Sequence, residues 1–537
     1  MKREHLILIA IIVLGTFLRF YKLDTQYIRF NDTFWRLTPA LELSKGILPN
    51  SYGGMPGISF LFFPVMLIKS SVMAAQIVIV LFGTALIPLS YYFSKKLSPE
   101  NKITPVLLAL FIAINPSFVA LSKVMMWDIV VLSFLVIALI TTYMTAKNNS
   151  FYFTIGHFVL LFFLVFLKAP NLLFFPFSLA YILYVRCFDS LKEIFSNVDA
   201  SFNKLFTRRT KDIWIGVVIF FIFYGLYLYF FPTIRSQFES GGGEGFFQEA
   251  YYSLNLRGTV RTLIVPLNTP ATNMYFALQA YSGNYLLLAF FATFQILIAV
   301  WGIFSFKNRK YAVFLLSIFF AYAVFYFFFT GWSARYLCIS IFILLFFLSL
   351  GIDKIIETIK KQKFSRMFFF SSCLLIGLII ASFFSASSLY TMEKEWGTEK
   401  SLKENFIEIN YKDAPYILKR AENENVSLIV SSYGKWLEFF KITEDRNIEI
   451  LDMFDIESEE DLIGIINERL KNNEVIWYIK GWPEGYEWGN IPQMCNKIEE
   501  NYELEQIYKG GRLYTKMDGK PEDSFLVYHL QNKNDEG

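Results

Sequence analysis

Four ionisable residues stand close to the ends of long apolar segments, and their types suit proton transfer and phosphate binding. Asp32 lies in IRFNDTFW and Asp128 in KVMMWDIVVL. Two carboxylates near one boundary of an apolar layer can act as a base and as the group that orients it. Lys168 in FLKAPN and Arg335 in GWSARYL are cations in similar positions. Cations there can hold a phosphate by charge-assisted hydrogen bonds.

Each of these residues also has a purely structural interpretation. Asp32 and Asp128 can both be helix N-caps, a common role of aspartate. Lys168 and Arg335 can extend their charged groups toward lipid headgroups. Taken singly, the capping role of each aspartate weighs at least as much as a catalytic one. Two further arginines, Arg257 and Arg261, are weaker phosphate-binding candidates of the same kind.

The apolar segments that flank these residues predict a membrane protein. Only 18% of the 537 residues are charged, 55% are hydrophobic and the mean hydropathy is +0.41. This composition excludes one large soluble enzyme, a disordered chain and a disulfide scaffold. A membrane-spanning helix needs about 17–25 mostly apolar residues. The segments predicted to span are 5–23, 72–93, 103–121, 128–146, 151–168, 172–187, 213–231, 284–306, 311–330, 336–352 and 367–386.

Lysine and arginine clusters predict how these spans are oriented. The segment 57–68 is short and contains Pro64, so we expect it to lie in the outer membrane interface. With that segment not crossing and the N-terminus inside, every dense basic cluster falls on the cytoplasmic side. The prediction is therefore about eleven spans, outer loops at 24–71 and 232–283, and an extracytoplasmic C-terminus. The basic residues lie in short loops between spans, so no nucleic-acid partner is expected.

The end of the chain differs from the rest. Residues 391–537 carry 31 acidic and 18 basic residues, a net charge of −13, whereas residues 1–390 carry a net charge of +17. Strand-like and helical runs alternate there, which predicts a small sheet covered by helices. We therefore expect a soluble extracytoplasmic α/β domain over 387–537 that stabilises the protein or gates its substrate. The expected strands are 426–432, 447–451 and 474–479, and the expected helices are 411–423, 457–471 and 492–501.

The order of these pieces resembles the GT-C superfamily of polyprenyl-phosphate-sugar glycosyltransferases. The resemblance is closest to the branch of protein O-mannosyltransferases and lipid A aminoarabinose transferases. It covers most of residues 1–386, and the motifs are individually loose but specific in their order. They are LRFYKLD (18–24), Asn31-Asp32 followed by Gly46, MPGISFLFFPVML (55–67), NPSFVALSKVMMWD (115–128), LKAP (167–170) and Arg335-Tyr336.

The resemblance implies an all-α, GT-C-like polytopic membrane domain over 1–386, followed by the α/β domain. It implies transfer of a sugar from a polyprenyl-phosphate donor to an extracytoplasmic protein, lipid or glycan by inverting displacement. Asp32 would take the acceptor's proton and Asp128 would orient the acceptor or Asp32. Lys168 and Arg335 would hold the donor phosphate.

The resemblance also suggests residues that contact the sugar, and it leaves departures. Asn31, Trp35 and Tyr52 would contact substrate, although an interfacial aromatic belt explains the aromatic pair as well. The family's acidic pair is usually Asp-Glu, whereas this chain has Asn31 and Asp32, so one carboxylate is missing. Met55 stands where close relatives have a basic residue.

We expect no cofactor. The three histidines form no ligand cluster in the sequence, which disfavours a His-based metal site. Related oligosaccharyltransferases bind a divalent ion through carboxylates, and the few acids on the outer face disfavour that alternative here.

Two other functions are alternatives. One is a transporter or flippase for a lipid-linked saccharide. We find no internal repeat, and the ionisable residues gather at one boundary rather than at the middle of the membrane, where transporters bind their substrates. The other is a catalytically inactive membrane scaffold, which the asparagine at position 31 favours.

Overall fold

The structure is a computed structural model of the 537-residue chain. It describes residues 3–21, 23, 34–49, 55–123, 127–148, 150–188, 204–207, 210–231, 285–330, 337–361, 377, 413–431, 434–456, 458–480, 491–509, 514–515, 521–522 and 526–533. Contacts divide the chain into two compact units. The first unit is Met1–Leu23, Gly54–Gly57 and Gln76–Glu395, and the second is Asp24–Gly53, Ile58–Ala75 and Trp396–Gly537.

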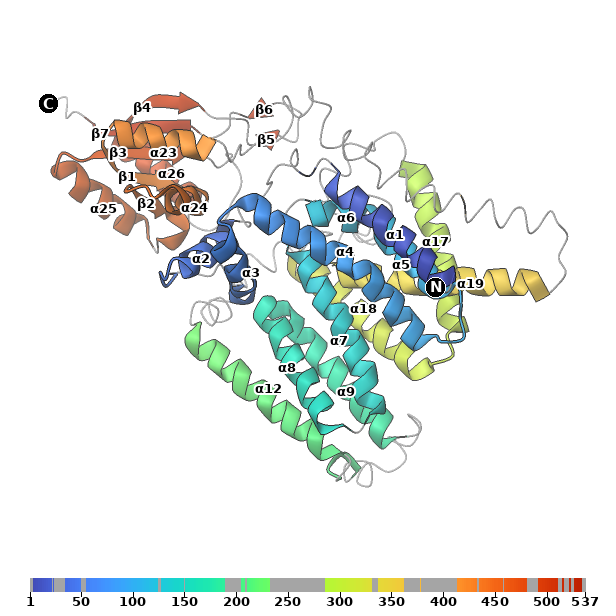
Figure 1. Ribbon diagram of the computed structural model, residues 1–537. Helices are drawn as coiled ribbons and strands as arrows, with labels where there is room; N and C mark the ends of the chain where they lie inside the picture. The colour runs from blue at the N-terminus through green and yellow to red at the C-terminus, as the bar shows by residue number, and fades with distance from the viewer. Residues whose placement is uncertain are drawn as a thin grey trace. The chain divides into compact units, whose positions relative to one another are not determined.

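The first unit is helical (Figure 1). Within it α7 packs on α8 and α9, α8 packs on α12, and α19 contacts α5, α7, α17 and α18. Its helices are α1 (Arg3–Phe20), α4 (Val72–Leu97), α5 (Thr104–Ile114), α6 (Pro116–Lys123), α7 (Asp128–Lys147), α8 (Phe151–Leu167), the 3₁₀ helix η3 (Ala169–Leu173), α9 (Phe174–Cys187), α12 (Lys211–Phe230), α17 (Tyr285–Ser305), α18 (Arg309–Thr330) and α19 (Cys338–Lys361).

These helices confirm the predicted all-α polytopic fold. Each predicted span from 5–23 to 336–352 contains a helix, and the last, 367–386, lies outside the described residues. Among the described residues, five helices are long and apolar enough to cross a membrane, and the bent pair α5–α6 adds a sixth. The segment 57–68 forms α3 (Pro56–Ile68), which has 13 residues and is shorter than a span needs.

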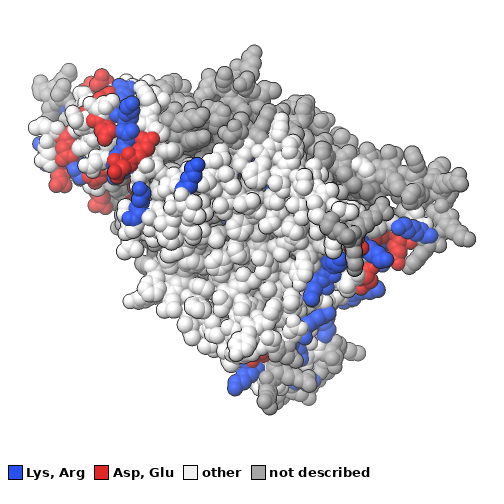
Figure 2. All heavy atoms as spheres, in the orientation of Figure 1, with Lys and Arg blue, Asp and Glu red and all other residues white. Residues whose placement is uncertain are grey.

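The surface of the first unit is suited to lipid. Large apolar side chains of α12 are exposed, including Val218 (57%), Phe221 (53%) and Ile222 (56%). An exposed apolar surface of this extent marks contact with a membrane or another protein. On the face shown in Figure 2, a broad area of the helices lacks charged side chains, and Lys and Arg side chains gather near its lower right edge. This chain is a membrane protein.

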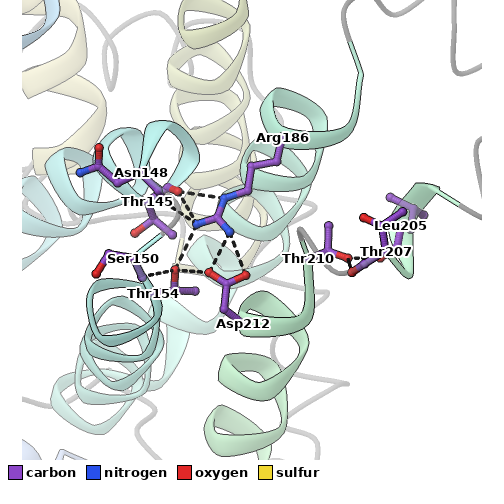
Figure 3. A network of polar contacts seen from close by, with 9 residues as sticks. All are labelled: Thr145, Asn148, Ser150, Thr154, Arg186, Leu205, Thr207, Thr210 and Asp212. Atoms are coloured by element: carbon purple, nitrogen blue, oxygen red, sulfur yellow. Dashed lines mark hydrogen bonds and ion pairs between the residues drawn. The ribbon is translucent and has the colours of Figure 1, made fainter.

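A polar network ties together one end of four helices of this unit (Figure 3). Arg186, in the last turn of α9, forms an ion pair of 2.8 Å with Asp212 in the first turn of α12. It also donates to the carbonyls of Thr145 (2.7 Å) and Asn148 (2.7 Å) at the end of α7. Thr154 of α8 donates to Asp212 (2.7 Å). The arginine thereby satisfies carbonyls that the end of α7 leaves without an intrahelical donor.

The second unit contains the α/β domain. Its main sheet has the order β2-β1-β3-β7-β4. Strand β1 pairs in parallel with β2 and β3, and β7 pairs antiparallel with both β3 and β4. A separate pair is β5 (Tyr514–Thr515) with β6 (Pro521–Glu522). The main strands are β1 (Val426–Ser431), β2 (Glu449–Asp452), β3 (Val475–Lys480), β4 (Tyr502–Lys509) and β7 (Leu526–Asn532).

Helices cover both faces of this sheet. Leu428, Ile476 and Tyr478 pack against α25 (Glu459–Lys471) and α26 (Ile491–Asn501) in the core of the domain. On the other face, the Arg420 guanidinium of α23 (Asp413–Asn423) lies over the Trp477 ring. Parallel β1 and β2 need a crossover connection. The helix α24 (Gly434–Glu444) lies in that connection, and η6 (Met453–Asp455) follows β2.

Two helices of the first outer loop belong to this second unit. They are α2 (Phe34–Ser44) and α3, and Ser59 of α3 donates to the Arg36 carbonyl of α2. The sequence had assigned residues 24–71 to the membrane domain as a loop, and nothing in it indicated that α2 packs on α24, which lies about 400 residues later.

Candidate functional site

The structure joins two of the sequence-predicted site residues in one buried ion pair. The Lys168 ammonium lies 2.7 Å from Asp128 Oδ1, and the two side chains are only 8% and 10% exposed. Asp128 is the first residue of α7, and Lys168 is the extended residue between α8 and η3. Since α7 and α8 pack together and only a short turn joins them, the start of the first and the end of the second lie at the same end of the hairpin.

Local chemistry explains why each residue stands where it does. Helix α8 ends at Leu167, because Pro170 has no N–H with which to continue it. The Lys168 N–H still donates to the Leu164 carbonyl at 3.0 Å, which fixes the backbone before it leaves the helix. Asp128 lies in the first turn of α7, where the helix dipole favours a negative charge.

The ion pair decides against both structural interpretations of these residues. Trp127 occupies the N-cap position of α7, so Asp128 is not the cap that its place in the sequence suggested. The Lys168 ammonium pairs with a carboxylate inside the protein instead of extending outward. Removing two charges from water is costly, and their attraction offsets the cost only while both partners remain.

The turn after Lys168 is fixed by further polar contacts. Asn171 of η3 donates to the Leu164 carbonyl at 2.9 Å, and Tyr322 of α18 donates to the Asn171 side-chain oxygen at 3.1 Å. Both Asn171 and Tyr322 are buried. The LKAP turn is therefore held by α8 and α18, which limits how far Lys168 can move.

The span before Asp128 is broken into α5 and α6, which meet at 49°. Asn115 is extended at the break, as the residue before a proline prefers to be. Its side-chain oxygen accepts the N–H groups of Ser117 (3.1 Å) and Phe118 (3.2 Å), so it caps α6. Because Pro116 has no N–H, the Ile112 carbonyl of α5 loses its usual donor, and Ala113 loses the N–H of Ser117 to the cap.

A fully buried arginine supplies the missing donors. Arg19, in the last turn of α1, donates to the carbonyls of Ile112 (2.9 Å) and Ala113 (3.0 Å) and, through Nε, to the Ser122 hydroxyl (3.3 Å). A Cβ at Gly83 would lie 2.1 Å from Ser122 Oγ and 3.1 Å from Arg19 Nε, so a larger residue would crowd this contact.

The end of α6 is tied to its neighbours as well. The buried Lys123 ammonium donates to the Tyr21 carbonyl at the end of α1 (2.6 Å), and Gln76 of α4 donates to the Lys123 carbonyl (2.6 Å). Asp128 follows five residues later in the chain, and Arg19 and Lys123 fix the helix α6 that precedes it. In the sequence, an arginine and a lysine next to apolar runs are the signal for such contacts, but they do not show which carbonyls are bound.

A second group of charges lies in the second unit, between α2 and the α/β domain, around the buried Lys435. The Lys435 ammonium of α24 pairs with Glu438 (3.0 Å) and with Asp455 of η6 (2.7 Å). Burial alone would lower the pKa of Lys435, but these two carboxylates raise it above its ordinary value. Burial, together with the negative charges of Glu438 and Asp455, raises the pKa of Glu42 on α2 to about 7, against a lowering effect of Lys435 and Lys441. The sequence analysis did not single out Glu42 as a site residue.

The remaining predicted site residues are placed differently. Trp35 is half-buried on α2. Asn31, Asp32, Tyr52, Arg257, Arg261 and Arg335 lie outside the described residues. Within the described part of the chain, no group of three His, Cys, Asp or Glu side chains is placed to hold a metal ion. The absence of a cofactor stays a prediction.

The fold is similar to the folds of a solved ArnT and a solved oligosaccharyltransferase, in line with the resemblance seen in the sequence. Solved structures show this across nearly the whole chain. The chain matches ArnT from Cupriavidus metallidurans bound to undecaprenyl phosphate with a TM-score of 0.53 and 10% identity, over 97% of both chains. The apo state of that ArnT gives a TM-score of 0.54 at 9% identity, again over 97% of both chains.

An oligosaccharyltransferase gives a similar match. The chain matches the Archaeoglobus fulgidus oligosaccharyltransferase, tethered to an acceptor peptide with an NVT sequon, with a TM-score of 0.52 and 12% identity. The match covers 99% of this chain and 74% of that one. No family model matches the sequence, and no curated protein sequence matches it either. The likeness is therefore one of fold.

Proposed function

We propose that this chain is a membrane glycosyltransferase that moves a sugar from a polyprenyl phosphate to an extracytoplasmic acceptor. The observation that supports this most is the buried Asp128–Lys168 pair at one end of the α7–α8 hairpin in a GT-C fold. Undecaprenyl phosphate, named for the ArnT structure, is a lipid phosphate of the kind that such a donor would leave behind. A cation that holds a phosphate and a carboxylate that orients that cation are the groups this reaction needs.

The proposed chemistry is a single displacement. The acceptor's hydroxyl or amine attacks the anomeric carbon while the bond from that carbon to the phosphate oxygen breaks. Asp32 takes the acceptor's proton. The negative charge that develops on the departing polyprenyl phosphate is stabilised by Lys168 and Arg335, and Asp128 keeps Lys168 in place. A phosphate monoester is a good leaving group, so neither an acid nor a metal ion is assigned to it.

Replacing Asp32 with asparagine tests the proposal directly. Asparagine caps helices about as well as aspartate, so expression should stay normal, whereas loss of a general base should lower transfer by about 10²–10⁴-fold. The purified protein, reconstituted in liposomes, would be given radiolabelled polyprenyl-phosphate sugars and assayed for labelled product. Thr33→Ala is the control, because Asn31-Asp32-Thr33 is a formal N-x-T glycosylation site. Full transfer by Asp32→Asn would assign the base elsewhere, with Asp128 as the next candidate.

The orientation of the chain is a second expected result. Single cysteines at 188–212 should react with a membrane-impermeant reagent only from the cytoplasmic side, and cysteines at 232–283 or 400–537 only from outside. The reason is the segregation of basic residues. Labelling of position 200 from outside would place Asp32 and Asp128 on opposite sides of the membrane and would contradict the proposed site.

A further inference from the structure

The α/β domain packs against α2, the helix that follows Asp32 in the chain. Phe34, the first residue of α2, packs edge-on against Phe439 of α24, with ring centroids 5.5 Å apart, and lies 6.1 Å from the Phe440 ring. Phe34 and Phe439 are both 1% exposed. Asp32 stands two residues before Phe34 in the chain.

A buried hydrogen bond fixes the register between the two helices. Thr38 of α2 donates from its hydroxyl to the Lys435 carbonyl at 2.8 Å, and Thr38 is fully buried. The Lys435 N–H in turn donates to Asp452 Oδ2 at the end of β2 (2.9 Å). A Cβ at Gly434 would lie 2.5 Å from the Asp452 Cβ, so glycine lets β2 and α24 approach. These two hydrogen bonds therefore connect α2 to the sheet through Lys435 and Asp452.

Charged groups of α24 and η6 also lie near α2. The Lys435 ammonium is held between Glu438 and Asp455, and Glu42 stands one turn beyond Thr38 on α2. The charged groups that act on Glu42 are Lys435, Glu438 and Lys441 from α24 and Asp455 from η6. Two of these are positive and two are negative, so an ionised Glu42 gains little net attraction for the cost of its burial.

We infer that the α/β domain serves as a positioning device for α2 of the first outer loop. Its helix α24 holds α2 through Phe34, Thr38 and Lys435, and α2 begins two residues after Asp32 in the chain. This role rests on the proposed glycosyltransferase function, because it gives the domain a part in that reaction. Thr38 and Lys435 are positioning residues, since they hold α2, the helix that follows Asp32 in the chain.

The contact should tighten as the pH falls. An unpaired glutamate has an ordinary pKa of 4.5, whereas that of Glu42 in the contact is raised to about 7. The contact therefore takes up a proton between these values. The stability that this proton contributes is fully present below the lower pKa and is lost as the pH rises through the higher one. Between pH 8 and pH 6, we expect up to about a tenfold gain in the protection of α2.

The test is hydrogen exchange and sugar transfer on the full-length protein in lipid nanodiscs. Thr38→Val should make the amides of α2 exchange about fivefold faster, the effect of losing one hydrogen bond. Thr443→Val is the matched control, since its hydroxyl donates only to Phe439 and Phe440 carbonyls within α24. Phe34→Ala/Thr38→Val should speed exchange of α2 more than 100-fold. Unchanged protection of β1 and β3 would show that the domain remains folded.

Two results are expected, and three others would each refute one step of the inference or of the proposed function. The inference predicts that Phe34→Ala/Thr38→Val lowers kcat at least about tenfold, and that Glu42→Gln removes the pH dependence of the protection of α2, measured relative to the intrinsic exchange rate at each pH. Wild-type protection of α2 in the double variant would refute the contact. Lost protection with wild-type kcat would refute the positioning role. A wild-type protein that transfers no sugar from any polyprenyl-phosphate donor would refute the proposed function itself, a different failure from either of these.

Discussion

Replacing Lys168 with methionine is expected to destabilise the helical unit and to remove most sugar transfer. The substitution leaves the Asp128 carboxylate buried without its partner. Breaking a buried ion pair in this way costs about 3–5 kcal/mol. In addition, the donor phosphate loses a charge-assisted hydrogen bond, which lowers transfer by the remaining folded protein roughly 10–100-fold. Thermal unfolding in nanodiscs and transfer per folded molecule measure the two effects separately.

A second variant separates stability from chemistry. The double variant Lys168→Met/Asp128→Asn leaves no unpaired charge buried at the position of this ion pair, so most of the lost stability should return. Transfer should not return, because the lysine that would hold the donor phosphate is still missing. Recovery of transfer together with stability would show that the pair only joins α7 to α8, and both residues would leave the proposed site.

The Arg186–Asp212 pair offers a matched control. It is also buried in the first unit, with side chains 3% and 13% exposed, and it also joins helix ends. Arg186→Met should destabilise the protein about as much as Lys168→Met does, since it too leaves a carboxylate without its cation. Its transfer rate per folded molecule should stay close to that of the wild type. Equal losses of transfer in both variants would mean that the assay reports stability alone.

The helices were predictable because long apolar runs have one interpretation in this chain. No soluble core needs so many runs of about 20 apolar residues, and their lengths match a bilayer. The break between α5 and α6 was harder to predict. Pro116 indicates a break, but the 49° bend depends on the cap by Asn115 and on the donors from Arg19. The Arg19 contacts join residues about 90 positions apart, which no local pattern reveals.

The α/β domain shows a similar limit. Strands β1 and β3 are apolar runs and were expected, and so were α23, α25 and α26. The helix α24 was missed, although two parallel strands in succession require a connection of this kind. Strands β4 and β7 were also missed, since half of their side chains are polar and face outward. The packing of α2 on α24 could not be predicted, because the pattern of each helix fits many partners.

Part of the Asp128–Lys168 pairing could be predicted from the sequence. Asp128 and Lys168 were each singled out, and both were expected on the outer side. Two successive spans with a short turn must be antiparallel, so the start of the first and the end of the second meet at one end. The step that the sequence could not supply is the 2.7 Å contact between the side chains, which depends on how α7 and α8 are rotated about their axes.

Replacing Arg19 with methionine should destabilise the protein by about 2–6 kcal/mol, since it leaves the carbonyls of Ile112 and Ala113 buried without a donor at roughly 1–3 kcal/mol each. Arg19→Lys should rescue little, because an ammonium is a single point and cannot reproduce the planar fork that reaches two carbonyls and Ser122. Thermal unfolding and the monodisperse fraction after extraction measure the loss.

Two comparisons test whether the helix break is the reason. Arg309→Met is the matched control, since its exposed guanidinium also binds helix-end carbonyls, those of Ile303 and Phe304. Exposed sites of this kind change stability by no more than about 0.5 kcal/mol. Pro116→Ala returns an N–H group next to the break, so it should restore part of the stability of Arg19→Met while adding little to the wild type. If Pro116→Ala gives no rescue, then Arg19 stabilises the protein through α1 packing, and the two carbonyls are not what it is there to satisfy.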